Sequence, residues 1–111
     1  MILKTTDLNN ALKALSGVIP QKSPVPIVEN VFIKKHTDNS VYVLGTNYET
    51  FMCLSMLAEE PEDILLPFAL FSKTVQSISS EYIEINGGQI KAGNSVFNIQ
   101  PMNHEDFPQL P

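Results

Sequence analysis

The stretch DLNNALKALS, residues 7–16, decides the fold class. Its apolar side chains recur at i, i+3, i+4 and i+7, the spacing of one face of an α-helix. They are Leu8, Ala11, Leu12 and Leu15. The asparagines, lysine and serine of the stretch fall on the opposite face. We therefore predict a helix over residues 7–16, with Asp7 accepting hydrogen bonds from its first amides.

The segments that flank this helix are typical of strands and turns. Residues 1–4 form a short β-like run before it, and three prolines after it hold an extended loop, because proline has no amide hydrogen. Further β-like runs follow at residues 27–35, 41–44 and 48–57. The last run carries apolar side chains on both faces, which predicts that both faces are covered.

The same order of elements recurs in the second half of the chain. An acidic connector, residues 59–63, leads into it. The second unit comprises a short strand, a helix and three strands, at residues 64–66, 68–78, 82–86, 89–92 and 95–100. A repeated unit predicts two helices side by side against two antiparallel sheets, an α+β architecture. We predict one domain over residues 1–111, ending in an extended exit linker at residues 102–111.

Composition excludes several classes of function. The 111 residues carry seven lysines against twelve acids, a net charge of −5, and no arginine. Bidentate guanidinium contacts to guanine or phosphate are therefore excluded. One cysteine, Cys53, cannot close an internal disulfide, which favours a cytoplasmic protein. No apolar run approaches the roughly 20 residues of a membrane span, and the start at Met1 is too briefly apolar for a secretory signal.

Side chains suited to catalysis or metal binding are scarce. Two histidines and one cysteine do not form a zinc-ligand pattern, and no serine has the context of a nucleophile elbow. The run HED at residues 104–106 lies in the expected linker, where adjacent side chains point in different directions. We therefore expect no metal, no cofactor and no enzymatic activity.

Five strings, taken in their order, resemble the N-terminal domain of the bacterial sliding clamp, the beta subunit of DNA polymerase III. They are LKALSGVIP at 12–20, VPIVEN at 25–30, GTNYE at 45–49, LP at 66–67 and EDFPQL at 105–110. The resemblance implies the DNA-clamp fold, in which each domain repeats a strand–helix–strands unit. Three domains make a subunit, and this chain would be the first.

The resemblance also implies a function and partners. Two subunits close head to tail into a ring that encircles duplex DNA non-specifically and tethers the replicative polymerase. Helices line the hole of the ring and sheets form its outer wall. The pocket that captures peptides of the polymerase and of the clamp loader lies in later domains, so these partners would bind outside this chain.

The resemblance implies that three lysines face the DNA, one by a match of position and two by their place on helices that line the hole. Lys22 follows the first helix at a position that is basic in the family, and Lys13 and Lys73 lie on the polar faces of the two helices. Each would place a point charge near a phosphate without reading sequence. The alternative for all three is an ordinary solvated lysine.

The subunit interface implied by the resemblance departs from the usual pattern. Its apolar part is retained at Leu70, Thr74, Phe97 and Ile99, with burial in the core as the alternative for the last two. The basic residues expected near 68–70 and 93–97 are replaced by uncharged ones, with Lys91 as the nearest charge. We therefore expect a more apolar, less salt-sensitive ring closure. A second reading remains open, a clamp-like interaction module without a DNA function.

Overall fold

The computed structural model describes residues 1–109. The elements follow the predicted repeated order, with a strand, a helix and then strands in each half. They are β1 (Ile2–Lys4), α1 (Thr5–Leu15), η1 (Pro26–Glu29), β2 (Asn30–Thr37), β3 (Ser40–Thr46), β4 (Phe51–Glu59), β5 (Ile64–Pro67), α2 (Phe68–Gln76), β6 (Tyr82–Asn86), β7 (Gln89–Ala92), β8 (Ser95–Asn98) and η2 (His104–Asp106), where η marks a 3₁₀-helix.

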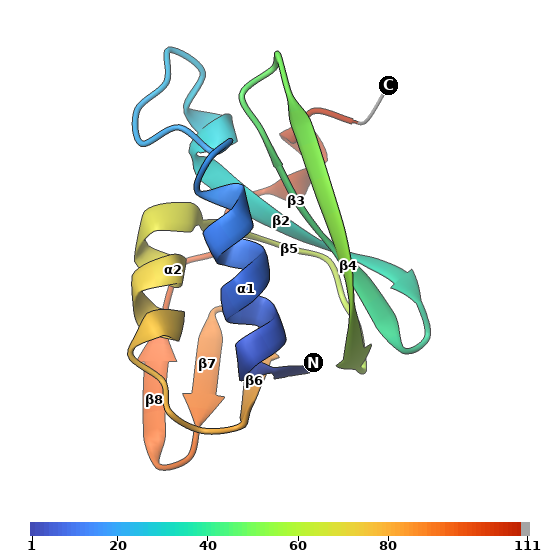
Figure 1. Cartoon of the computed structure of the whole chain (residues 1–111), viewed down its shortest axis with the longest axis vertical. Coiled ribbons are helices and arrows are strands. Elements are labelled where there is room, and N and C mark those ends of the chain that lie inside the picture. Colours follow the sequence, from blue (N-terminus) through green and yellow to red (C-terminus); the bar gives the residue numbers. More distant parts are fainter. Residues whose placement is uncertain (110–111) are drawn as a thin grey trace.

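The strands form one antiparallel sheet in the order β5-β2-β3-β4-β1-β6-β7-β8. Both helices lie side by side on one side of this curled sheet (Figure 1), which confirms the α+β prediction. The two predicted antiparallel sheets are continuous with one another and form one curled sheet of eight strands. Strand β1 pairs with β4 through Leu3 and Ala58 and with β6 through Leu3 and Ile83, so it joins the two halves.

The core lies between the helices and the inner face of the sheet. All four apolar residues predicted for the first helix are buried there, and α2 contributes Phe71 and Val75. Strands from both halves supply further side chains, including Ile33 and Ile83, each with no exposed surface. Burial of one such Leu, Ile or Phe side chain stabilises the fold by about 1.5–3 kcal/mol. The two halves therefore share a single core.

The predicted helix ends differ from the observed ones. Helix α1 begins at Thr5, directly after β1, and no side chain caps it. The amide of Thr5 instead donates to the carbonyl of Glu81 at 2.9 Å. Asp7 therefore is not the cap, although its charge lies in the first turn, where the helix dipole favours it. Helix α2 ends at Gln76, with Ser77 as its C-cap, rather than at residue 78.

Two predicted strands begin later than expected. Pro26 starts the 3₁₀-helix η1, so β2 begins only at Asn30, whose side-chain amide donates to the carbonyl of Ile27 at 3.0 Å. Strand β4 begins at Phe51 because residues 47–50 form the tight turn of the β3–β4 hairpin.

The outer face of β4 is open to solvent. Leu57 points there and is 71% exposed, although the apolar pattern predicted that both faces of this strand are covered. The inner-face residues Met52, Leu54 and Met56 do pack against the core. The second face of β4 is therefore not covered by any part of the chain that the structure describes.

The exit segment is folded rather than extended. The amide of Met102 donates to the carbonyl of Leu65 at 2.8 Å, and residues 104–106 form η2. Phe107 is then buried against Phe32 and Leu44 on the outer face of the sheet. Its ring meets that of Phe32 edge-on at 5.4 Å between centroids. The expectation of an extended linker is wrong for residues 102–107, and Leu110 and Pro111 lie outside the described residues.

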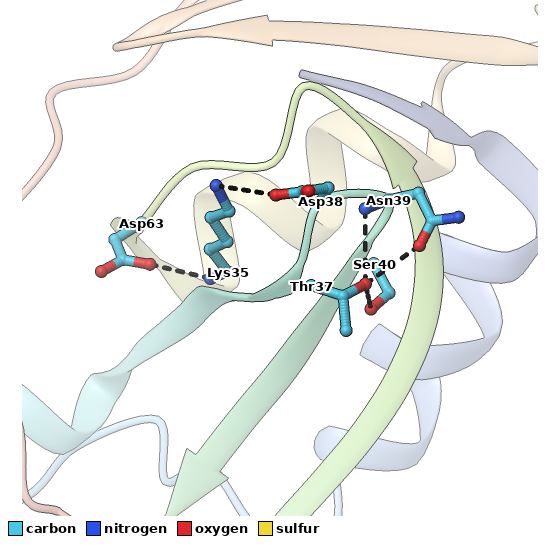
Figure 2. Close-up of polar contacts among 6 residues, drawn as sticks. All are labelled: Lys35, Thr37, Asp38, Asn39, Ser40 and Asp63. Carbon is cyan, nitrogen blue, oxygen red and sulfur yellow. Dashed lines mark hydrogen bonds and ion pairs between the residues drawn. The ribbon is translucent and has the colours of Figure 1, made fainter.

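The β2–β3 turn is held by short-range polar contacts (Figure 2). The Lys35 ammonium lies 3.6 Å from a carboxylate oxygen of Asp38, and the Lys35 amide donates to Asp63 at 2.7 Å. The hydroxyl of Thr37 contacts Asn39 and Ser40 across the turn. Within residues 1–109 the Lys35–Asp38 contact is the single ion pair, so no other described lysine is neutralised in this way.

No helix within residues 1–109 is long and apolar enough to cross a membrane.

Candidate nucleic-acid interface

The polar faces of the two helices form the candidate interface. Lys13 is exposed on α1 and Lys73 is exposed on α2. Between the C-terminal end of α1 and α2 lies a groove of about 830 Å³, whose polar lining includes Ser16, Lys73 and Gln76. Because α1 and α2 pack side by side (Figure 1), their hydrogen-bonding and cationic side chains share one side of the domain.

Lys22 is exposed on the loop between α1 and η1. This loop is anchored at its base by Ile19, which is buried against Gly45 of β3. A Cβ atom on Gly45 would lie 2.6 Å from Cγ1 of Ile19, so only glycine permits this close approach. Further along, the amide of Ser23 donates to the Glu29 carboxylate at 3.1 Å. The loop therefore presents Lys22 from a fixed base.

Of the three lysines, Lys73 lines the groove, and the loop that carries Lys22 borders it. Its lining includes Pro20 and Gln21, which immediately precede Lys22, together with Lys73. Lys13 does not line the groove and lies on the exposed face of α1. The helix side of the domain thus offers three separated cations rather than one cluster.

The helix side carries three exposed lysines on a chain with a net charge of −5. None of the three lysines has an ion-pair partner within residues 1–109. The acids nearest in sequence to Lys13 and Lys22 are Asp7 on α1 and Glu29 in η1, and Glu29 lines the same groove as Lys73. The larger acidic groups lie in the connector after β4 and in the exit segment. A local positive face on an acidic protein can attract a polyanion, because charge distribution outweighs net charge at short range.

The residues predicted for a subunit interface fall into two environments. Leu70 is 52% exposed on α2, and Thr74, one turn later, is half-buried. Phe97 on β8 is half-buried and packs against the core. Ile99 lies after the end of β8, is only 4% exposed and belongs to the core. The sequence left Ile99 open between the subunit interface and the core, and the structure places it in the core.

Val96 is an edge residue that the sequence argument did not single out. It is 53% exposed on β8. Its exposure could have been predicted from the sequence, because successive side chains of a strand point to opposite faces. If Phe97 points inward, Val96 must point outward.

Within residues 1–109 no three His, Cys, Asp or Glu side chains are placed to hold a metal ion. Residues 104–106 form the short turn η2, and the ring of His104 stacks on Phe32 at 5.4 Å. Cys53 is exposed on β4, and its partial burial raises the pKa of its thiol. A raised pKa lowers the fraction of reactive thiolate. Cys53 therefore lacks the activation that a catalytic nucleophile needs.

Comparison with known families gives a match over the whole chain. The model of the family described as DNA polymerase III beta subunit, N-terminal domain, matches residues 1–111. The chain belongs to this family. Among curated relatives, a beta sliding clamp from Chlamydia pneumoniae is 28% identical over 116 residues, covering 99% of this chain and 32% of the relative. One from Chlamydia muridarum is 27% identical with the same coverage.

Solved structures share the fold. A sliding clamp from Bartonella birtlesii, solved with bound griselimycin, superposes with a TM-score of 0.87 at 20% identity, covering 100% of this chain and 31% of that one. A beta subunit from Thermotoga maritima gives a TM-score of 0.84 at 23% identity, covering 99% of this chain and 32% of that one. This member of the family thus spans about a third of the length of the relatives that it matches.

Proposed function

We propose that this chain acts as the first domain of a DNA sliding clamp, a non-catalytic processivity subunit of the replicative polymerase. The family match over residues 1–111 is the observation that carries the proposal. A ring of such domains would enclose duplex DNA and bind it through the backbone without sequence preference. The cytoplasmic location expected from the sequence belongs to this proposal, because replication takes place with the chromosome.

The helix side of the domain would face the DNA. Lys22, Lys13 and Lys73 are exposed there without ion-pair partners in the described chain, which supports a role in phosphate contact. Three point charges give weak, salt-sensitive binding, since each phosphate contact releases counterions. Weak contact suits a ring that must slide, because closure around the duplex prevents its loss.

The partners of the domain would bind at different places. The open edge at β8, together with Leu70 and Thr74 of α2, is proposed to meet a second clamp subunit. The polymerase and the clamp loader would bind parts of the subunit beyond this chain.

The test is retention on DNA by the complete gene product that carries these residues. Loaded onto circular DNA by its clamp loader, the protein is expected to remain bound and to leave when the circle is linearised. Failure to stay on a circle with the loader present would contradict the proposal. It would favour the clamp-like interaction module, which the net charge of −5 also permits.

A double variant tests the lysines themselves. Lys22→Ala with Lys73→Ala is expected to weaken equilibrium DNA binding and to lower the slope of log K against log salt by about 2, one for each lost phosphate contact. Lys34→Ala is the matched control, because Lys34 is exposed on β2, away from the helices. If the double variant and the control change DNA binding equally, Lys22 and Lys73 are ordinary surface residues without a role in phosphate contact.

A further inference from the structure

Exposed apolar side chains gather around one cleft on the outer face of the sheet. Leu57 near the end of β4 is 71% exposed, and Tyr82 at the start of β6 is 54% exposed. Strand β1 lies between these two strands, and its half-buried Ile2 lines the same cleft, of about 760 Å³. Single exposed apolar residues are ordinary on a protein surface, but a group of three around one cleft is typical of a contact site.

The strand register shows why these side chains share the outer face. Leu3 pairs with Ala58 and with Ile83, and all three are buried in the core. Because successive side chains of a strand point to opposite faces, the neighbours of these three residues point outward. Those neighbours are Leu57 and Glu59 on β4, Ile2 and Lys4 on β1, and Tyr82 and Glu84 on β6.

The two walls of the cleft belong to fixed parts of the fold. On one side the amide of Ala58 donates to the carbonyl of Asn39 at 3.0 Å, which holds the β2–β3 turn against β4. Within that turn the Thr37 hydroxyl donates to the Asn39 side chain at 2.9 Å (Figure 2). On the other side Asp7 lines the cleft from the first turn of α1, which follows β1 directly. The cleft is therefore formed before any partner binds.

The charged side chains around the apolar group are mostly acidic. Asp7 and Glu59 line the cleft, and Glu84 lines a smaller cleft that adjoins it. Lys4 and Lys91 line the two clefts as well, so the acids outnumber the lysines by three to two. Within residues 1–109 none of these five side chains makes an ion pair. The acids are therefore free to pair with the cations of a partner.

The wider surroundings add negative charge and narrow the choice of partner. Glu60 and Glu81 are exposed and adjoin Glu59 and Tyr82 in sequence. An anionic partner, such as a nucleic acid or an acidic lipid surface, would be repelled. A second copy of this chain would bring like charge together, because a twofold contact places the same patch on both sides. A cationic partner with an apolar side chain fits the surface best.

We propose that this surface binds a short segment of another protein, in which an apolar side chain is flanked by lysine or arginine. We call it the β1 surface, which comprises Ile2, Leu57, Tyr82, Asp7 and Glu59. The apolar side chain would enter the cleft against Leu57 and Tyr82, and the flanking cations would pair with the two acids. This contact is separate from the helix side and from β8, and it needs neither DNA nor a ring.

Peptide binding to the complete gene product tests the chemistry of the partner. Three fluorescent peptides of equal length alternate leucine with lysine, leucine with glutamate, and serine with lysine, and their binding is followed by fluorescence anisotropy. The leucine–lysine peptide is expected to bind about tenfold more tightly than either of the others, because only it fills the apolar cleft and pairs with the acids. Equal affinity for either of the other peptides would overturn the inference.

Substitutions then locate the binding site. Leu57→Ser is expected to weaken binding of the leucine–lysine peptide about tenfold, because it removes an apolar wall of the cleft. Glu59→Lys should weaken it about fivefold, since a repulsion replaces an attraction. Val25→Ser and Glu49→Lys are the matched controls, because Val25 is 41% exposed on the loop before η1 and Glu49 is exposed in the β3–β4 turn. Circular dichroism of each variant checks its folding.

Unchanged binding in both Leu57→Ser and Glu59→Lys, or equal losses in the two controls, would overturn the inference. A loss in only one of the two would show that either the apolar or the charged part of the contact is missing, and would overturn the stated chemistry. Self-association of the complete protein that Leu57→Ser removes would make a second copy the occupant and would overturn it as well. Each of these outcomes leaves the proposed clamp function standing, because that function is tested by retention on circular DNA.

Discussion

Removal of the Phe107 ring tests whether the exit segment is part of the folded domain. Phe107 is 6% exposed and belongs to a small apolar cluster on the outer face of the sheet, with Phe32, Leu44 and Leu65. The main-chain hydrogen bond from Met102 to Leu65 fixes the start of the same segment. Phe107→Ala would remove the side chain that holds its far end.

The size of the effect follows from burial and from the size of the cluster. A buried Phe→Ala substitution typically costs about 3–5 kcal/mol, including the cavity that remains. The Phe107 cluster has only four buried members and lies at the surface, so its cavity opens to solvent and can collapse. We therefore expect the lower end, a loss of about 3 kcal/mol in the free energy of unfolding. For a domain of this size the melting temperature should fall by roughly 12–24 °C.

The assay is urea unfolding followed by circular dichroism, together with amide hydrogen exchange. Phe107→Leu is the graded variant and should cost only about 1 kcal/mol, because the cluster stays apolar. Tyr82→Ala is the matched surface control, since Tyr82 is 54% exposed on β6. Its effect should stay within about 0.5 kcal/mol. In Phe107→Ala the amide of Met102 should also exchange faster.

A loss below about 0.5 kcal/mol in Phe107→Ala, equal to that of the Tyr82 control, would refute this reasoning. It would mean that the exit segment does not pack on the sheet in solution. Unchanged exchange of the Met102 amide would point the same way.

Two further predictions follow from close packing and from a thiol. Gly45→Ala should destabilise the fold by about 1–3 kcal/mol, because its Cβ would meet Ile19 at 2.6 Å and Leu15 at 3.0 Å. Ile19→Ala removes both contacting atoms of Ile19, so in urea unfolding the double variant should lose less stability than the sum of the two single variants. An additive double variant would contradict the predicted contact. Partial burial raises the pKa of the Cys53 thiol, so alkylation by iodoacetamide should reach half its maximal rate at a higher pH than for a cysteine peptide. A midpoint at or below that of the peptide would contradict the predicted shift.

Local patterns predicted the elements that one segment can specify alone. The apolar stripe of residues 8–15 requires a helix with one buried face, and that face is buried. The strands at Tyr82–Asn86 and Gln89–Ala92 agree residue for residue with the prediction. The two residues between them, Gly87 and Gly88, form a tight turn, and Gly87 adopts a positive φ of 57°. Glycine reaches that conformation without steric cost, so the hairpin was readable from sequence.

The candidate interfaces were only partly predictable. The polar faces of the helices, and so the exposure of Lys13 and Lys73, follow from helical periodicity. The burial of Ile99 and the exposure of Val96 depend on where β8 ends and on which of its sides stays unpaired. The alternation of side chains along a strand predicts which residues share a face. Only the packing of the sheet decides which of the two faces is covered.

The sequence by itself determined the α+β class, the repeated order of elements and the family, because periodicity, turn residues and short strings are local properties of the chain. Only the tertiary structure decided that β1 joins both halves into one sheet and that residues 102–107 fold back onto it. It also decided that the amide of Thr5 bonds to Glu81, so that α1 needs no side-chain cap. The physical reason is the same in each case. These contacts join residues far apart in the chain, and no local pattern records the partner that satisfies a backbone amide or covers an apolar side chain.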